Sequence, residues 1–327
     1  MCSPAFFYFL DLSTRVRILF ISNSKATMKK LLLKLFIFSA PFIVIALIII
    51  RVDPYNYFSY NAQNTHTKKQ IAYKINYALW KIIEYKRNPL PNILLGDSQI
   101  GRLKSDTIFE ITDEAFYNFS YGGATLPEMI NTFWFATETT KLKNAYFGIS
   151  FNHFNVYNGA KDRVTSARQI TSNPLLYLVN RNVLSATLHL IKTKITGNIT
   201  QIERPPMSRQ QFWTYNLNIP TRRYYSNYSY PRVWYEDLLR ISEFCRDNDI
   251  NFKIIILPTH IQLQSKIQEY GLTKEYKVYL EDLAEVAAVY DFNKKNHWTE
   301  DKNNFEDPRH FKRNLARELI REIWQVK

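Results

Sequence analysis

Cysteine and glycine are scarce in this sequence. The scarcity of cysteine excludes some classes of protein, and the scarcity of glycine makes each glycine near a motif informative. The 327 residues include two cysteines, Cys2 and Cys245, which are too few for a disulfide framework. They show no metal-ligand spacing with each other or with the histidines, so we expect no metal ion and no other cofactor. Only eight glycines occur, so a glycine beside a motif is more informative than usual.

Acidic residues are also few relative to basic ones. Aspartate and glutamate number 29 against 43 lysines and arginines, which gives a net charge of +14. Such a balance suits an anionic partner: nucleic acid, a membrane surface or an acidic envelope polymer. Because the chain lacks zinc-finger spacing, an RNP-type aromatic motif and an arginine-rich arm, we predict no nucleic-acid partner. A solvated basic surface near anionic lipid and a groove that binds a polyanion both remain open.

One long uncharged run lies near the N-terminus, at residues 35–50 (LFIFSAPFIVIALIII). With residues 31–34 it reaches about 20 residues, the length that spans membrane hydrocarbon. Basic residues precede the run and few follow it. The positive-inside rule therefore predicts a cytoplasmic segment at 1–30, a single-pass anchor at 31–51 in the inner (cytoplasmic) membrane, and an extracytoplasmic C-terminal domain.

A cleaved signal peptide is the alternative to an anchor. The run is long for a signal peptide, and the RVDPYNYF that follows it has no small-residue cleavage pattern. Met28 is followed by two lysines and the apolar run, so a start at Met28 also fits the sequence. We therefore favour an uncleaved anchor.

Short apolar runs alternate with helical segments from residue 92 onward, which predicts an α/β domain at 91–327 with a parallel sheet between two layers of helices. In such sheets the ligand site lies beyond the carboxyl ends of the strands. The predicted strands are 92–95, 115–119, 145–149, 252–257 and 287–292, and the predicted helices are 126–141, 233–248, 261–286 and 311–325. Residues 52–90 are predicted to be a helical linker, with a helix at 65–87, and residues 156–232 an insertion with a helical piece at 174–192.

Candidate catalytic residues follow the first predicted strand and precede the last helix. Ser98, in the sequence Gly-Asp-Ser, comes directly after the strand, where a serine is exposed and suits the role of nucleophile. Asp97 beside it is interpreted as a structural residue of the turn. Asp307 and His310 are three residues apart, so Asp307 can orient the imidazole while His310 takes the serine proton.

The ends of the second and third strands supply candidate hydrogen-bond donors. The second ends in NFSYGGAT, whose Gly122 and Gly123 let backbone N–H groups approach an oxygen closely. The third ends in GISFN, which places the Asn152 amide at the same edge of the sheet. Nucleophile, donors and base are therefore expected to converge there.

The order of these blocks resembles the SGNH (GDSL-like) hydrolases, and the resemblance extends from about residue 92 to residue 325. It implies a three-layer sandwich with a five-stranded parallel sheet in flavodoxin-like order. It also implies that Ser98 is the nucleophile, His310 the base and Asp307 the orienting acid. The oxyanion hole would comprise the N–H groups of Ser98 and Gly123 and the side chain of Asn152.

The third block departs from the family pattern, which is usually G-x-N-D, because here it reads S-F-N-H. Asn155 is therefore an alternative to Asn152. Asp301 and Glu306 are alternatives to Asp307, although the D-x-x-H spacing favours Asp307. With its anchor and insertion, the chain looks most like the envelope branch of the family, which includes the teichoic-acid D-alanylation protein and alginate-type O-acetyltransferases.

Four other side chains are candidate substrate-binding groups: His153, His260, Arg222 and Arg223. His153 adjoins Asn152. His260 follows the fourth strand, where a histidine bonded to loop backbone is the favoured interpretation. The two arginines lie in an aromatic stretch at 213–232, which predicts either a wall that stacks on sugars or binds a polyanion, or a flap packed on the domain or the membrane.

The sequence therefore predicts an extracytoplasmic serine esterase or O-acyltransferase that uses a Ser-His-Asp triad on acyl groups of a cell-envelope glycan or polymer. The acylated polymer is the expected substrate, and a membrane acyltransferase is a possible partner. Hydrolysis and transfer use the same triad, so the residues do not separate them. The alternative is a catalytically inactive protein of the same fold that binds glycan or acts as an envelope scaffold.

Overall fold

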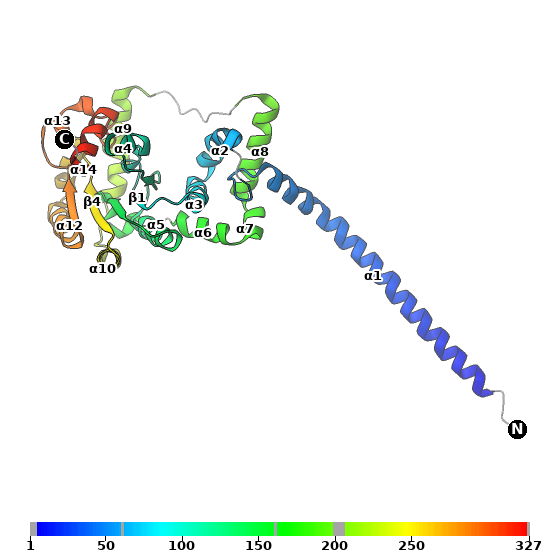
Figure 1. The fold of residues 1–327 in the computed structure, drawn as a ribbon. Coiled ribbons are helices and arrows are strands. Elements are labelled where there is room, and N and C mark those ends of the chain that lie inside the picture. The colour runs from blue at the N-terminus through cyan, green and yellow to red at the C-terminus, as the bar shows by residue number, and fades with distance from the viewer. Residues whose placement is uncertain (1–4, 60–61, 160–161, 199–206, 326–327) are drawn as a thin grey trace.

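A computed structural model of the chain describes residues 5–59, 62–159, 162–198 and 207–325, with side chains from residue 28 onward except those of 62–64. A globular part carries the helix α1 (Ala5–Val52), which projects away from it (Figure 1). Within the described residues, Met28–Val52 is the segment long and apolar enough to cross a membrane, with a mean hydropathy of 2.7. It is a candidate membrane anchor or signal sequence. Cys2 lies outside the described residues.

The sheet consists of five parallel strands in the order β2-β1-β3-β4-β5. This is the flavodoxin-like order, so the predicted α/β fold is confirmed. The strands are β1 (Asn92–Leu95), β2 (Tyr117–Asn118), β3 (Asn144–Gly148), β4 (Asn251–Ile256) and β5 (Ala288–Asp291). Each strand lies within one residue of its predicted range, or inside it.

The helices of the globular part are α2 (Ala62–Ile75), α3 (Tyr77–Arg87), α4 (Ser105–Thr112), α5 (Leu126–Thr139), α6 (Arg163–Ser172), α7 (Pro174–Leu178), α8 (Arg181–Thr196), α9 (Arg209–Tyr225), α10 (Arg232–Asp247), α11 (Ile261–Glu269), α12 (Thr273–Val286), α13 (His297–Glu300) and α14 (Arg313–Trp324). Short 3-10 turns lie between them at η1 (Ile100–Arg102), η2 (Phe151–His153), η3 (Val156–Asn158) and η4 (Lys302–Asn304).

Alternate strand residues point into two separate cores, because successive side chains of a strand face opposite sides of the sheet. Ile93 and Leu95 of β1 join one core, with residues of α5, α10 and α12. Leu94 joins the other, with residues of α4 and α14. Both faces of the sheet are therefore covered, which explains why the strands read as continuous apolar runs.

Three of the predicted helices are each two helices in the structure. The predicted helix at 65–87 breaks at Asn76, whose side chain accepts the Leu79 N–H and so begins α3. The helix predicted at 261–286 breaks before α12 at Gly271, whose φ of +72° is left-handed. The piece at 174–192 breaks at Asn180, which caps α8. In each case a single polar or glycine residue overrides the apolar periodicity around it.

Residues 52–90, predicted to be a helical linker, contain α2 and α3 and share a core with the sheet. Tyr55, Leu79, Trp80 and Tyr85 are buried in the same core as the sheet residues. The insertion at 156–232 also contributes to that core, for example through Tyr177. The helices α2 and α3 and the insertion therefore pack into one core with the sheet.

Candidate active site

The turn that carries Ser98 lies close against the carboxyl ends of β1 and β3. Ile100 packs over this edge, and a Cβ on Gly148 would lie 2.0 Å from Ile100 Cγ1. A Cβ on Gly96 would lie 2.5 Å from the same atom. Side chains at these two strand ends would therefore push the turn off the sheet. Asp97 braces the turn by accepting the Gln99 N–H at 2.8 Å, which agrees with its expected structural role.

Three side chains distant in sequence form a hydrogen-bonded relay. Ser98 Oγ lies 2.7 Å from His310 Nε2, and His310 Nδ1 lies 2.7 Å from Asp307 Oδ2. Because an ionised carboxylate can only accept, Nδ1 carries the proton and Nε2 is free to accept from the serine hydroxyl. Asp307 is buried, whereas the His310 side chain is 20% exposed. The Asp307 end of the relay is therefore shielded from solvent, whereas solvent and ligands can reach the His310 end.

Asp307 is held as a carboxylate by its partners. Burial acts to raise its pKa, but hydrogen bonds from the His310 ring and from the N–H groups of Arg309 and His310 outweigh burial and lower the pKa below the ordinary value. The two alternative acids have other partners. Asp301 caps η4 through the Asn303 N–H. Glu306 forms a bidentate pair with Arg102.

The loop at Gly122 and Gly123 is fixed by its carbonyl oxygens. The Gly122 carbonyl accepts from the Tyr77 hydroxyl at 2.8 Å and from Arg163 Nη1 at 3.1 Å. The Gly123 carbonyl accepts from Arg163 Nη2 at 3.2 Å. In a trans peptide the N–H points opposite to the preceding C=O, so the Gly123 N–H is directed away from Tyr77 and Arg163. Gly123 adopts φ +59°, which favours glycine at this position.

Backbone donors at the site are unoccupied. Within the described part of the chain, no protein group accepts from the N–H of Ser98 or of Gly123. Arg163 is itself held by the buried carboxylate of Glu128, through contacts of 2.6 Å at Nε and 2.7 Å at Nη2. The carbonyls of Gly122 and Gly123 are therefore held by side chains of the protein, while the Gly123 N–H remains available for a ligand.

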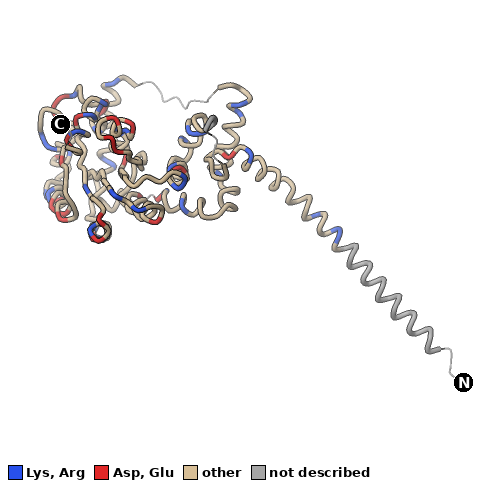
Figure 2. Tube along the Cα trace, in the orientation of Figure 1, with Lys and Arg blue, Asp and Glu red and all other residues tan. Residues whose placement is uncertain are grey.

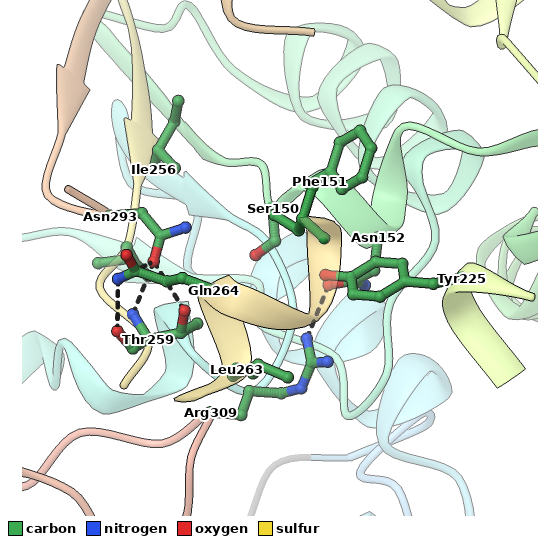
Figure 3. A pocket seen from close by; sticks show the side chains of 12 residues that line it. Ser150, Phe151, Asn152, Tyr225, Ile256, Thr259, Leu263, Gln264, Asn293 and Arg309 are labelled. Carbon is green, nitrogen blue, oxygen red and sulfur yellow. Dashed lines mark hydrogen bonds between the residues drawn. The ribbon is translucent and has the colours of Figure 1, made fainter. Parts of the chain in front are cut away.

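The Asn152 side chain is oriented by Arg309. Asn152 Oδ1 accepts from Arg309 Nη1 at 2.7 Å (Figure 3). A guanidinium can only donate, so this contact fixes which end of the amide faces Arg309 and turns Nδ2 away from it. Among the described residues, none accepts from Asn152 Nδ2. The Arg309 guanidinium also lies 5.0 Å from the ring centroid of Tyr224, a cation–π distance.

Asn155, the alternative to Asn152, has no free polar atom. Its Nδ2 donates to the carbonyls of Tyr224 and Asn227, at 3.0 and 2.7 Å. Its Oδ1 accepts from the N–H groups of Tyr157 and Ser229. Asn155 therefore joins two loops, and the structure leaves Asn152 as the amide available to a ligand.

Gln99 links the three segments of the site. Its Nε2 donates to the Arg309 carbonyl at 3.0 Å, and its Oε1 accepts from Ser150 Oγ at 2.7 Å. Beside this bridge lies a cavity of about 20 Å³, lined by Ser150, Asn152 and Arg309 among others (Figure 3). That volume accommodates about one water molecule. The Ser98 turn, the end of β3 and the segment before α14 are thus held together.

Two of the candidate substrate-binding side chains are buried. His153 has a ring nitrogen that accepts the Ser150 N–H, and its Nε2 lies 3.2 Å from Asp97 Oδ2. His260 accepts the Gln262 N–H, and burial lowers the pKa of its ring. Neither ring is free to face a ligand, so we do not retain these two as substrate-binding groups. The finding for His260 agrees with the favoured loop interpretation.

Arg222 and Arg223 lie in the last turn of α9 and are exposed. They do not belong to the site residues described above. Arg309, Gln99, Tyr77 and Arg163 do, although the sequence did not single them out. Arg309 and Gln99 adjoin His310 and Ser98, which is a local signal that could have found them. Within the described residues, no group of three His, Cys, Asp or Glu side chains is arranged to hold a metal ion.

No protein-family model and no curated protein sequence matches the chain. Among solved structures, a Streptococcus pneumonia protein provisionally described as a platelet activating factor is 13% identical, over 81% of this chain and 99% of its own, with a TM-score of 0.40. A Bacteroides fragilis NCTC 9343 protein provisionally described as an acylhydrolase is 9% identical, over 74% and 94%, with a TM-score of 0.37. Likenesses this weak carry no argument, so the interpretation of the site depends on its own geometry.

Proposed function

We propose that this chain is a membrane-anchored serine esterase or O-acyltransferase of the SGNH (GDSL-like) type. The observation that carries the proposal is the relay of two 2.7 Å contacts from Ser98 through His310 to Asp307. A serine hydroxyl bonded to a correctly oriented imidazole is the arrangement that activates oxygen for attack on an acyl carbon. The free N–H groups and the Asn152 amide beside it add the donors that such a reaction requires.

The proposed reaction proceeds in two halves. Ser98 Oγ attacks the carbonyl carbon of an ester or thioester, and its proton passes to His310 Nε2. The tetrahedral adduct expels the alcohol or thiol, which takes that proton, and leaves the acyl group on Ser98. Water or an acceptor hydroxyl then attacks the acyl group while His310 again receives and returns a proton. Asp307 stays ionised and stabilises the imidazolium.

The adduct carries negative charge on the former carbonyl oxygen. We propose that the N–H groups of Ser98 and Gly123 and Nδ2 of Asn152 donate to this oxygen. Donors held in place before the reaction cost no reorganisation when the charge develops. The Tyr77 and Arg163 contacts to the loop carbonyls, and the Arg309 contact to Asn152, provide that positioning.

The proposed location is the outer face of the inner membrane. Lys29, Lys30 and Lys34 lie in the first part of the Met28–Val52 segment, and no acidic residue lies within it (Figure 2). By the positive-inside rule this charge favours a cytoplasmic N-terminus. An enzyme fixed there would act on acyl groups of an envelope glycan or polymer. If the acyl group arrives from a membrane acyltransferase partner, the second half of the reaction is transfer and not hydrolysis.

The catalytic proposal is tested with the full chain in detergent. Ser98→Ala should abolish p-nitrophenol release from short acyl esters and labelling by a fluorophosphonate, because both require the activated Oγ. Ser226→Ala, which changes an exposed serine outside the site, should retain both. Full activity in Ser98→Ala would end the proposal. An unlabelled, inactive wild-type chain would instead favour the glycan-binding or scaffold alternative.

The proposed topology is tested separately. A phosphatase reporter fused after residue 327 should be active, because this reporter works only outside the cytoplasm. A green fluorescent protein fused at the same position through the same export route should stay dark. The opposite pattern would reverse the orientation and leave the catalytic proposal untouched.

A further inference from the structure

A second, larger cavity lies away from the relay, beside the end of α1. Its volume is about 410 Å³, and its walls include Tyr57, Phe58, Lys86, Arg87, Thr171 and Pro174. These residues come from the segment after α1, the last turn of α3, and the junction of α6 and α7. The proposed function uses none of them.

The walls of this cavity carry two cationic side chains and no carboxylate. Arg87 Nη2 donates to the Tyr57 carbonyl at 2.9 Å, which holds the guanidinium at the wall. Lys86 is exposed, and no described residue pairs with it. The nearby Asp53 is buried, and its oxygens accept from the N–H groups of Tyr57 and Phe58 and from other groups of the same loop. The cavity thus suits an anionic group of small size.

Large apolar side chains are exposed on Phe58, a wall of the cavity, and on and just after α7, whose first residue is another wall. Within α7, Leu175 is 69% exposed and Leu176 is 43% exposed, and Val179 just after this helix is 79% exposed. Phe58, in the segment after α1, is 39% exposed. Pro174, a cavity wall, is the first residue of α7. Apolar surface on this scale is unfavourable in water, at about 25 cal/mol per Å². Such a patch marks a surface that contacts a membrane or another protein.

The position of the patch indicates what covers it. The apolar segment of α1 ends at Val52, and Asp53 and Tyr57 follow within the loop that lines the cavity. The helices α7 and α8 pack against α1 where it meets the globular part (Figure 1). The exposed patch therefore lies on a helix that contacts the candidate bilayer segment, and the two cations of the cavity share its wall with the first residue of that helix.

We propose that this cavity binds the phosphate headgroup of an anionic membrane lipid, while Phe58, Leu175, Leu176 and Val179 contact its acyl chains. The inference rests on the anchoring part of the proposed function and is independent of the chemistry at Ser98. Cations near an anionic leaflet contribute about 1 kcal/mol each, which adds to the burial of these apolar side chains. The globular part would then lie against the membrane in one orientation and would not swing freely on α1.

The test uses the full chain in lipid nanodiscs with and without phosphatidylglycerol in phosphatidylcholine. Cys2→Ser removes one native cysteine, and the other, Cys245, is buried. Val179→Cys then adds a single accessible cysteine, which is labelled with an environment-sensitive dye. Val233→Cys is the matched control, because Val233 is 64% exposed on α10, away from α1. We expect nitroxide lipids to quench the dye at 179 and not at 233.

The headgroup part is tested by Lys86→Gln. Losing about 1 kcal/mol of attraction should lower the ratio of quenched to unquenched dye at 179 about fivefold in discs with phosphatidylglycerol. The ratio should not change in discs of phosphatidylcholine alone. Lys141→Gln, at an exposed lysine on another part of the surface, should have no effect in either. An unchanged ratio in Lys86→Gln would refute the headgroup site.

A third labelled position separates failure of this inference from failure of the anchor. Phe42→Cys lies within the apolar part of α1, so its dye should be quenched by deeply placed nitroxides. If the dye at 42 is quenched and the dye at 179 is not, the lipid surface is wrong and the anchor stands. If neither is quenched, both are wrong. If the dye at 179 is shielded from water only when another membrane protein is added, the patch is a protein-docking surface and the proposal is overturned.

Discussion

Arg309 offers the sharpest test of how the site is built, because its side chain contacts the proposed oxyanion donor and not the relay itself. Its Nη1 donates to Asn152 Oδ1 at 2.7 Å, and its guanidinium lies over Tyr224. Arg309→Met keeps the unbranched stem of the side chain and removes every side-chain donor. The Asn152 amide would then be free to rotate, and Nδ2 would lose its fixed direction.

The expected loss is smaller than that for removing the donor itself. Hydrogen bonds to charged groups contribute about 1.5 to 3 kcal/mol, which corresponds to a fall in kcat of about tenfold to a hundredfold. Removing the donor by Asn152→Ala should cost about a hundredfold to a thousandfold. KM should change little in both variants, because the contact matters most when charge develops on the oxygen.

A double-mutant cycle on ester hydrolysis separates positioning from general damage. If Arg309 acts through Asn152, Arg309→Met should change kcat less than about twofold in the Asn152→Ala background. Arg246→Met, at an exposed ion pair on α10, is the matched control and should leave kcat and the melting temperature unchanged. Multiplicative losses in the double variant would refute the positioning role, as would a loss of kcat that simply follows a loss of melting temperature.

Two further predictions concern the helix α3. Tyr77→Phe keeps the ring and removes the hydroxyl that donates to the Gly122 carbonyl. Because one neutral hydrogen bond contributes about 1 kcal/mol, kcat should fall about fivefold. Tyr215→Phe, which changes an exposed tyrosine, is the control and should leave kcat unchanged. Burial lowers the pKa of Lys81 from 10.5 to about 7. The unfolded chain therefore binds more protons between these values, and stability should rise with pH across this window. Lys81→Met should flatten the rise in melting temperatures measured from pH 7 to pH 10, and an unchanged slope would show that Lys81 does not cause it.

The strands of the sheet could be predicted from the sequence because both faces of the sheet are covered. Strands covered on both faces need apolar residues at every position, so runs such as NILL at 92–95 stand out from their surroundings. The relay was predictable for a different reason. Asp307 and His310 are three residues apart, and one short turn fixes their relative position.

The parts that the sequence did not predict depend on contacts between distant segments. Tyr77 and Arg163 reach the same carbonyl from α3 and α6, and nothing near either residue indicates this. His153 shows the converse error. It adjoins Asn152 in sequence, but its ring is buried in the η2 turn and lies against Asp97. Helix breaks at Asn76 and Gly271 were missed because apolar periodicity continues across both.

The order of the strands also constrains how the chain folds. β3 ends at Gly148, but its neighbour β4 begins at Asn251, so the ribosome makes α6 to α10 before the two strands can pair. Until then β3 is an open edge, and such edges pair readily with other chains. Closing so long a loop is slow, since its entropy is lost before the pairing is gained. The half-made sheet is therefore the stage of synthesis at which this edge is open to pairing with other chains.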